Sequence, residues 1–226
     1  MALLDPDALA IYDAFYSRLA LTEGPFTEFE KEYIWLGIIL TGREAIGTHH
    51  LHKFRAESKD PSAIASVFAM VAMVEGSEVF SFPSENWGGR DLGINAADAY
   101  LEALLNACRH AEVPERLVHL GAAAICVCRR RWPQLALHIQ ELYRLGTPEN
   151  EILEALAFTM LPAGAPNFIN ACAVWKSLVE SGRVPAGPTV KAWAMMPLSG
   201  FGSVSFPDVK HSAFQRGTAQ GVGDRA

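Results

Sequence analysis

Hydrophobic and polar positions recur along most of the chain at the spacing of α-helices. Apolar residues return every three or four positions, and no alternating strand with a hairpin turn interrupts them. Thr27 followed by Glu30 forms a capping-box pattern, which predicts a helix from there to about residue 40. Because apolar residues cover almost the whole circumference of this helix, we expect it to be central and buried. The pattern predicts an all-α protein.

Proline and glycine residues mark where the other helices begin and end. Pro6 stands at an early helical position, where no amide donor is needed, and Gly146 is placed as a C-terminal stop. Residues 83–93 are rich in turn formers and predict a connecting loop. The further helices are expected at about residues 6–20, 44–57, 61–76, 95–111, 114–128, 133–145, from 148 onward, and 166–181.

The helical pattern before this loop is similar to the pattern after it. His50 and His138 lie 88 residues apart, and upstream of them the shift becomes 84. We predict two helical repeats packed together, residues 1–82 and 94–182, joined by the linker 83–93. The alternative is a chance match between two helical hairpins. The pairs that carry the two shifts are Ile64 and Ile152, Gly76 and Gly164, and Leu36-Gly37 with Leu120-Gly121.

The composition changes after residue 182. Residues 183–226 contain many Pro, Gly and Ser residues, yet also large apolar residues such as Trp193 and Phe214. A disordered tail is normally poorer in such residues. We therefore predict an extended C-terminal arm over 183–215, laid on the body or on a neighbouring subunit, with a frayed end at 216–226.

Charge and cysteine content narrow the classes of function. The formal net charge of −6 argues against a general nucleic-acid binder, because phosphate neutralisation needs clustered Lys and Arg residues. No apolar run of about eighteen residues without charge is visible, and the N-terminal residues lack a secretory pattern. The four cysteines form neither a disulfide framework nor a paired zinc motif. We expect a cytoplasmic protein that associates with no membrane.

The segment from His138 to Cys172 resembles the carboxymuconolactone decarboxylase family of the AhpD-like superfamily. The family pattern is a helical His, a Gly, an acidic E-I pair and an A-G-x-P turn, matched here by His138, Gly146, Glu151-Ile152 and Ala163–Pro166. The first half resembles the same unit more loosely. The resemblance implies an all-α fold of two AhpD-like repeats and assembly into a homo-oligomer. It also implies relatives that are decarboxylases or peroxide-reducing proteins.

The peroxide-reducing branch depends on a C-x-x-C-x-x-x-H motif, in which one thiolate attacks the peroxide and the second thiol resolves the product. Counting back from His50 places Arg43 and Ile46 at the cysteine positions. Counting back from His138 places Arg131 and Gln134 there. Both copies lack the dithiol, so the chain is not expected to be a peroxidase of this type.

The decarboxylase branch requires a proton donor and a cation or amide that stabilises the developing enolate. His50 and His138 are the candidates for general acid–base catalysis, because an imidazole titrates near neutrality. The alternative is that each is a buried structural histidine bonded to a carbonyl. Arg43 and Glu44 are expected to begin the helix that carries His50, with Arg43 two turns before it on the same face.

In this interpretation Arg43 orients a substrate carboxylate and Glu44 orients a histidine or acts as a base. Arg131 stands in the same relation to His138. The alternative is an ordinary solvated helix start, with Glu44 complementing the helix dipole. Asn167 either meets a substrate oxygen or caps its helix, and Trp35 either lines a pocket or belongs to the core.

Two further histidines, His49 and His52, are neighbours on one helical face and permit a metal hypothesis. No H-E-x-x-H motif supports it, so we predict no metal and no cofactor. The sequence therefore favours a cofactor-independent decarboxylase or lyase acting on a small carboxylated intermediate of aromatic catabolism or a lactone. The alternatives are a non-catalytic helical protein that binds a small acid and a His-ligated metal-dependent enzyme.

Overall fold

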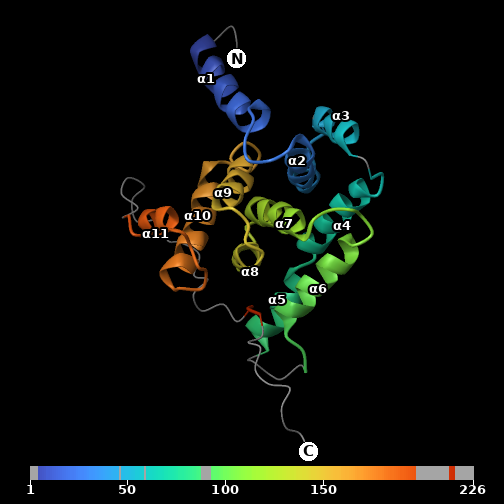
Figure 1. The fold of residues 1–226 in the computed structure, drawn as a ribbon, viewed down its shortest axis with the longest axis vertical. Coiled ribbons are helices and arrows are strands. Elements are labelled where there is room, and N and C mark those ends of the chain that lie inside the picture. The colour runs from blue at the N-terminus through green and yellow to red at the C-terminus, as the bar shows by residue number, and fades with distance from the viewer. Residues whose placement is uncertain (1–4, 46, 59, 88–92, 197–213, 217–226) are drawn as a thin grey trace, which may run out of the picture.

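The computed structural model describes residues 5–45, 47–58, 60–87, 93–196 and 214–216, and within these ranges the chain is helical without a strand. The predicted all-α fold is confirmed (Figure 1). The elements are α1 (Pro6–Tyr16), a π-helical turn η1 (Ser17–Leu21), α2 (Glu28–Gly42), α3 (Thr48–Glu57), α4 (Ala63–Glu75), α5 (Glu78–Asn86), α6 (Ala96–Cys108), α7 (Glu115–Arg129), α8 (Trp132–Arg144), α9 (Glu149–Phe158), α10 (Ala165–Glu180) and α11 (Pro188–Ala194).

Helices α2 and α7 form the centre of the molecule and pack against each other (Figure 1). The capping box predicted for α2 is present, since Thr27 Oγ1 accepts from the Glu30 amide and the Glu30 side chain accepts from the Thr27 amide. Every residue of α2 from Lys31 to Ile38 is buried. Helix α7 also approaches α4 closely at Gly121, where a Cβ atom would lie 2.7 Å from the sulfur of Met70. The expectation of a central, buried second helix is confirmed.

Each central helix packs on helices that come after it in the chain. Helix α2 packs on α3 and α4, and α7 packs on α8 and α9. Both central helices end at an arginine in the left-handed conformation, Arg43 and Arg130, each with φ 56°. The two helix starts, Glu28 and Glu115, and the two caps are each 87 residues apart. This spacing differs from the shift of 84 expected upstream of the histidines, and the two-repeat organisation stays a prediction.

The helix predicted from residue 44 to 57 begins only at Thr48. Arg43 takes a left-handed conformation that ends α2, and the Glu44 amide donates to the Ile39 carbonyl at 3.0 Å, closing the turn. Gly47 follows against α2, where a Cβ atom would lie 2.8 Å from Ile39. The expectation that Arg43 and Glu44 open the helix of His50 is therefore wrong.

Two other expected boundaries differ. The predicted loop 83–93 starts later, because α5 continues through Pro83 to Asn86, while residues 88–92 lie outside the described part. The arm predicted as extended contains α11, which opens with Pro188 at its first position, where the missing amide costs nothing. Helix α11 packs on α10, with the rings of Trp193 and Trp175 5.6 Å apart. Of the rest of the arm, the structure describes residues 183–187, 195–196 and 214–215. Of the end predicted to be frayed it describes Arg216, and residues 217–226 lie outside the described part.

The stretch Ala63–Asn86, which spans α4 and α5, is long and apolar enough to cross a membrane by length and composition alone. A core helix of a soluble protein passes the same test. In this stretch 33% of the most apolar window is buried. Helix α4 contributes Val67, Met70 and Val74 to the core and packs on α2, α6 and α7.

Candidate functional site

His50 lies at the wall of a pocket of about 340 Å³. The pocket is formed where α1, α2 and α3 meet the segment that follows α9, and most of its surface is apolar. The lining residues are Tyr12, Tyr16, Trp35, Ile38, Ile39, Glu44, Gly47, His49, His50, Leu161 and Pro162. Such a volume accommodates a small molecule.

A buried carboxylate holds the His50 ring from the side of α2. His50 Nδ1 lies 2.6 Å from Glu32 Oε2, and the Glu32 side chain has no exposed surface. Lys53 Nζ lies 3.6 Å from the other carboxylate oxygen and compensates its charge. The contact exists because Glu32 faces α3 from the first turns of α2 while His50 sits in the first turn of α3. With Nδ1 donating to Glu32, the Nε2 atom is left as the basic nitrogen of the ring.

Aromatic rings fix the orientation of His50. Its ring stacks on Trp35, with centroids 5.0 Å apart and an interplanar angle of 20°, and Trp35 in turn stacks on Phe158. The adjacent His49 shares a hydrogen bond of 3.0 Å with the Tyr16 hydroxyl, whose pKa is raised by burial. The pocket therefore combines an apolar floor with imidazole and phenol groups that can exchange protons or hydrogen bonds with a ligand.

Some of the residues that were expected around His50 lie in its pocket and others do not. Glu44 and Trp35 line the pocket, and the Trp35 Nε1 atom is buried without a hydrogen-bond partner. Arg43 is exposed at the end of α2 and does not line it. Among the described residues, the pocket lining includes no Lys or Arg side chain.

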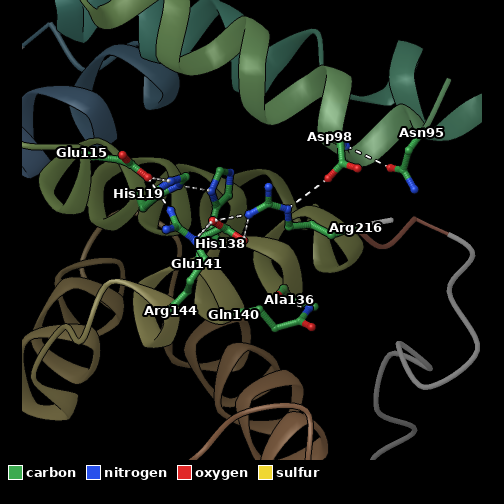
Figure 2. Close-up of polar contacts among 10 residues, drawn as sticks. All are labelled: Asn95, Asp98, Glu115, His119, Ala136, His138, Gln140, Glu141, Arg144 and Arg216. Atoms are coloured by element: carbon green, nitrogen blue, oxygen red, sulfur yellow. Dashed lines mark hydrogen bonds and ion pairs between the residues drawn. The ribbon is translucent and has the colours of Figure 1, made fainter. Parts of the chain in front are cut away.

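His138 lies in a second cluster of polar side chains (Figure 2). The ring has no exposed surface, its Nδ1 lies 3.0 Å from His119 Nδ1, and its Nε2 lies 2.9 Å from the Tyr100 hydroxyl. Burial lowers the pKa of His138 well below its usual value and lowers that of His119 to about 4. Both imidazoles are neutral at pH 7, so the two facing Nδ1 atoms share one proton as donor and acceptor.

Two carboxylates and two guanidinium groups border this histidine pair (Figure 2). Arg144 bridges Glu141 and Glu115, with two contacts of 2.6 Å. Arg216, from the C-terminal segment, contacts both oxygens of Glu141 at 2.9 and 3.0 Å and also pairs with Asp98. The four charges nearest the pair are therefore balanced.

The other residues expected beside His138 lie elsewhere. Arg131 precedes α8 and pairs with Glu78 of α5. Asn167 accepts a hydrogen bond from Arg130 at 3.1 Å and donates one to the Ala163 carbonyl at 2.9 Å, while Gly164 is the N-cap residue of α10. Asn167 is thus neither a helix cap nor a neighbour of His138 in any described contact.

His49 and His52, the two histidines considered as metal ligands, lie in different surroundings. His52 is exposed, and His49 contacts Tyr16. Among the described residues, the one group of three potential ligands within 4.8 Å of one another is Glu115, His119 and Glu141.

Several residues of both clusters were missed in the sequence. The pattern of Glu115 and His119, four positions apart on one helix, was an available signal, as was Glu141 three residues after His138. Glu32 offered no such signal, because its contact with His50 joins two helices. Arg216 contacts Glu141 of α8 and Asp98 of α6, which are far from it in the sequence, so no local pattern specifies its position.

The cysteines agree with the absence of a dithiol motif from the sequence. Cys108 and Cys126 are buried free thiols, and burial raises the pKa of both. A raised pKa opposes the thiolate that peroxide reduction requires.

The part of the chain that is similar to a known family runs from α6 into α10. Residues 95–177 match the sequence model of the carboxymuconolactone decarboxylase family. The match covers less than half of the chain, and this similarity supports a decarboxylase or AhpD-like function in general terms. Comparison of the chain with curated proteins and with solved structures gives no match.

Proposed function

We propose that the chain is a cofactor-independent decarboxylase or lyase for a small carboxylated ring-opened aromatic compound or lactone, acting in the pocket of His50. The observation that carries the proposal is the pairing of His50 with the buried Glu32 carboxylate at the wall of a 340 Å³ pocket. A carboxylate behind an imidazole fixes the tautomer and stabilises the protonated ring, as general acid–base catalysis needs.

The reaction requires a proton at the carbon that loses CO₂. Cleavage leaves an electron pair that delocalises into a neighbouring carbonyl, and His50, protonated on Nε2, delivers a proton to the resulting carbanion. Glu32 stabilises the imidazolium before transfer. Tyr16 and His49, already hydrogen-bonded to each other, supply donors for the enolate oxygen.

The apolar wall supports the same chemistry. Trp35, Ile38 and Leu161 surround the substrate with groups that solvate a carboxylate poorly. Charge spreads over a larger area as CO₂ departs, so an apolar environment disfavours the reactant more than the transition state. Arg43 lies outside the lining, so no role in the reaction is assigned to an arginine side chain.

The test compares His50→Gln and Glu32→Gln with the wild-type chain on carboxymuconolactone-type compounds, following CO₂ release and ultraviolet absorbance. We expect His50→Gln to lower kcat by about 10²–10⁴-fold, the usual contribution of general acid–base catalysis. Glu32→Gln should also lower kcat, because its amide can donate to Nδ1 and shift the ring proton to Nε2. His110→Gln, at an exposed histidine, is the matched control. Full turnover by both site variants would overturn the proposal.

A helical protein that binds a small acid without transforming it is the second candidate. Its support is the apolar pocket of about 630 Å³ between α9, α10 and α11, which contains Phe168, Trp175 and Trp193. Saturable binding of the same compounds without CO₂ release, unchanged by His50→Gln, would favour this function over the first.

Self-association in the cytoplasm belongs to the proposal. Helix α1 projects from the body, buries none of its residues, and exposes Ile11, Tyr12 and Phe15 (Figure 1). Tyr12 also lines the pocket of His50, so a second subunit packed on α1 would complete that wall. Light scattering that shows a monomer at micromolar concentration would contradict this assembly.

A further inference from the structure

Three side chains of the second cluster have the composition of a metal site. Glu115 and His119 lie one turn apart on α7, and Glu141 reaches toward them from α8 (Figure 2). One ligand atom from each residue can be chosen so that all three lie within 4.8 Å of one another. Imidazole nitrogen and carboxylate oxygen both bind Zn²⁺, and three protein ligands would leave the fourth position open, as in catalytic zinc centres.

The strongest indication is the unused nitrogen of His119. The ring is fully buried, yet its Nε2 has no hydrogen-bond partner and lies 3.7 Å from Glu115 Oε1. A buried polar atom without a partner is costly, and it is rare in native structures. A cation placed between this nitrogen and the two carboxylates would satisfy it.

The groups behind His119 are compatible with the tautomer that a metal requires. His119 Nδ1 faces His138 Nδ1 at 3.0 Å, and His138 Nε2 faces the Tyr100 hydroxyl at 2.9 Å. When His138 donates from Nε2 to Tyr100, its Nδ1 accepts from His119 Nδ1, and the Nε2 lone pair of His119 points at the carboxylates. Metal-bound histidines are commonly oriented by a hydrogen bond from their other nitrogen.

We propose that Glu115, His119 and Glu141 bind one divalent transition-metal ion of the Zn²⁺ or Co²⁺ type, and that Arg216 competes with the ion for Glu141. The nitrogen ligand distinguishes this class of ion from Mg²⁺ and Ca²⁺, which prefer oxygen ligands. The site is separate from the pocket of His50 and does not depend on the function proposed there.

The competition follows from the ion pairs. Arg216 contacts both oxygens of Glu141, so an ion can use this carboxylate fully only when Arg216 moves away. Arg144 can stay, because it uses a single oxygen of Glu141 and a single oxygen of Glu115. Arg216 belongs to a short segment in which Phe214 is buried against Tyr100. Binding of the ion is therefore coupled to release of the C-terminal segment from α8.

The experiment titrates the full, untagged and chelator-treated chain with Co²⁺, following visible absorbance and stoichiometry, and then displaces the Co²⁺ with Zn²⁺. We expect one ion per chain. Glu115→Gln, at an exposed position that should not disturb folding, and His119→Gln should each weaken binding at least about tenfold, the lower range seen for disturbed metal sites. Arg216→Gln should tighten binding, because the competing guanidinium is gone.

The His49→Gln/His52→Gln double variant is the matched control and should bind Co²⁺ as the wild type does. Loss of binding in this control alone would move the ion to α3 and overturn the proposal. Absence of stoichiometric binding in both the wild type and Arg216→Gln would overturn it too. If His119→Gln does not fold by circular dichroism, unchanged binding by Glu115→Gln together with unchanged binding by Glu141→Gln would decide against the site.

Discussion

Acidification should destabilise the fold through the buried His119–His138 pair. The pKa of His119 is lowered from 6.5 to about 4 because burial disfavours the charged ring. The folded protein therefore resists protonation, while the unfolded chain takes up a proton near pH 6.5. The stabilising contribution is complete above pH 6.5 and is lost as the pH falls from 6.5 toward 4.

The size of the effect follows from the shift. A lowering of about 2.5 units corresponds to about 3 kcal/mol once the pH is below 4, at 1.36 kcal/mol per unit. At pH 5, which lies between the two pKa values, protonation of His119 alone lowers the free energy of unfolding by about 2 kcal/mol. That is a substantial part of the total stability of about 5–15 kcal/mol expected for a folded protein.

Urea denaturation with a chelator present, at pH 7 and pH 5, measures this quantity as a difference in the free energy of unfolding. His119→Gln keeps the size and polarity of the side chain but cannot be protonated, so it serves as the reference. The wild type should lose about 2 kcal/mol more than His119→Gln over this interval. Equal losses in the two proteins would refute the argument that a neutral buried imidazole limits acid stability.

Three further predictions concern chain conformation and the C-terminal segment. Arg43→Gly should raise the free energy of unfolding by up to about 1 kcal/mol, measured by urea denaturation, because glycine adopts the left-handed cap without a Cβ clash. Thr27→Ala should lower it by about 1 kcal/mol in the same assay, since a helix cap is lost, and Thr27→Ser should not. Phe214→Ala should lower the thermal midpoint and increase proteolysis near the C-terminus, because this buried ring holds the segment that carries Arg216. Unchanged proteolysis would show that the segment is held by its ion pairs instead.

Local chemistry explains which parts of the fold could be predicted from the sequence. The capping box and the all-round apolar pattern of α2 act within one helix, so both were visible. The region of Arg43 was mispredicted because an arginine with φ 56° violates the usual preference for glycine at that position. Nothing in the composition of residues 41–47 favours a turn over a helix strongly enough to reveal it.

The sequence identified single residues of the candidate sites but not the partners that these residues contact on other helices. His50 and Trp35 were identified and share a pocket wall, but Glu32, which defines the chemistry of His50, comes from another helix. The predicted equivalence of His50 with His138 also missed the difference in their partners. One ring faces a carboxylate and the other a second imidazole, and this difference arises from packing between helices.

The neighbouring rings of Trp175 and Trp193 give the protein an optical signal of its own. The two indoles belong to α10 and α11, with centroids 5.6 Å apart and planes inclined by 55°. At this separation their electronic transitions couple, so the pair should produce a circular-dichroism couplet that vanishes when α11 undocks. Docking of the segment after α10 can therefore be followed in unlabelled protein, and Trp193→Phe identifies the signal by removing it.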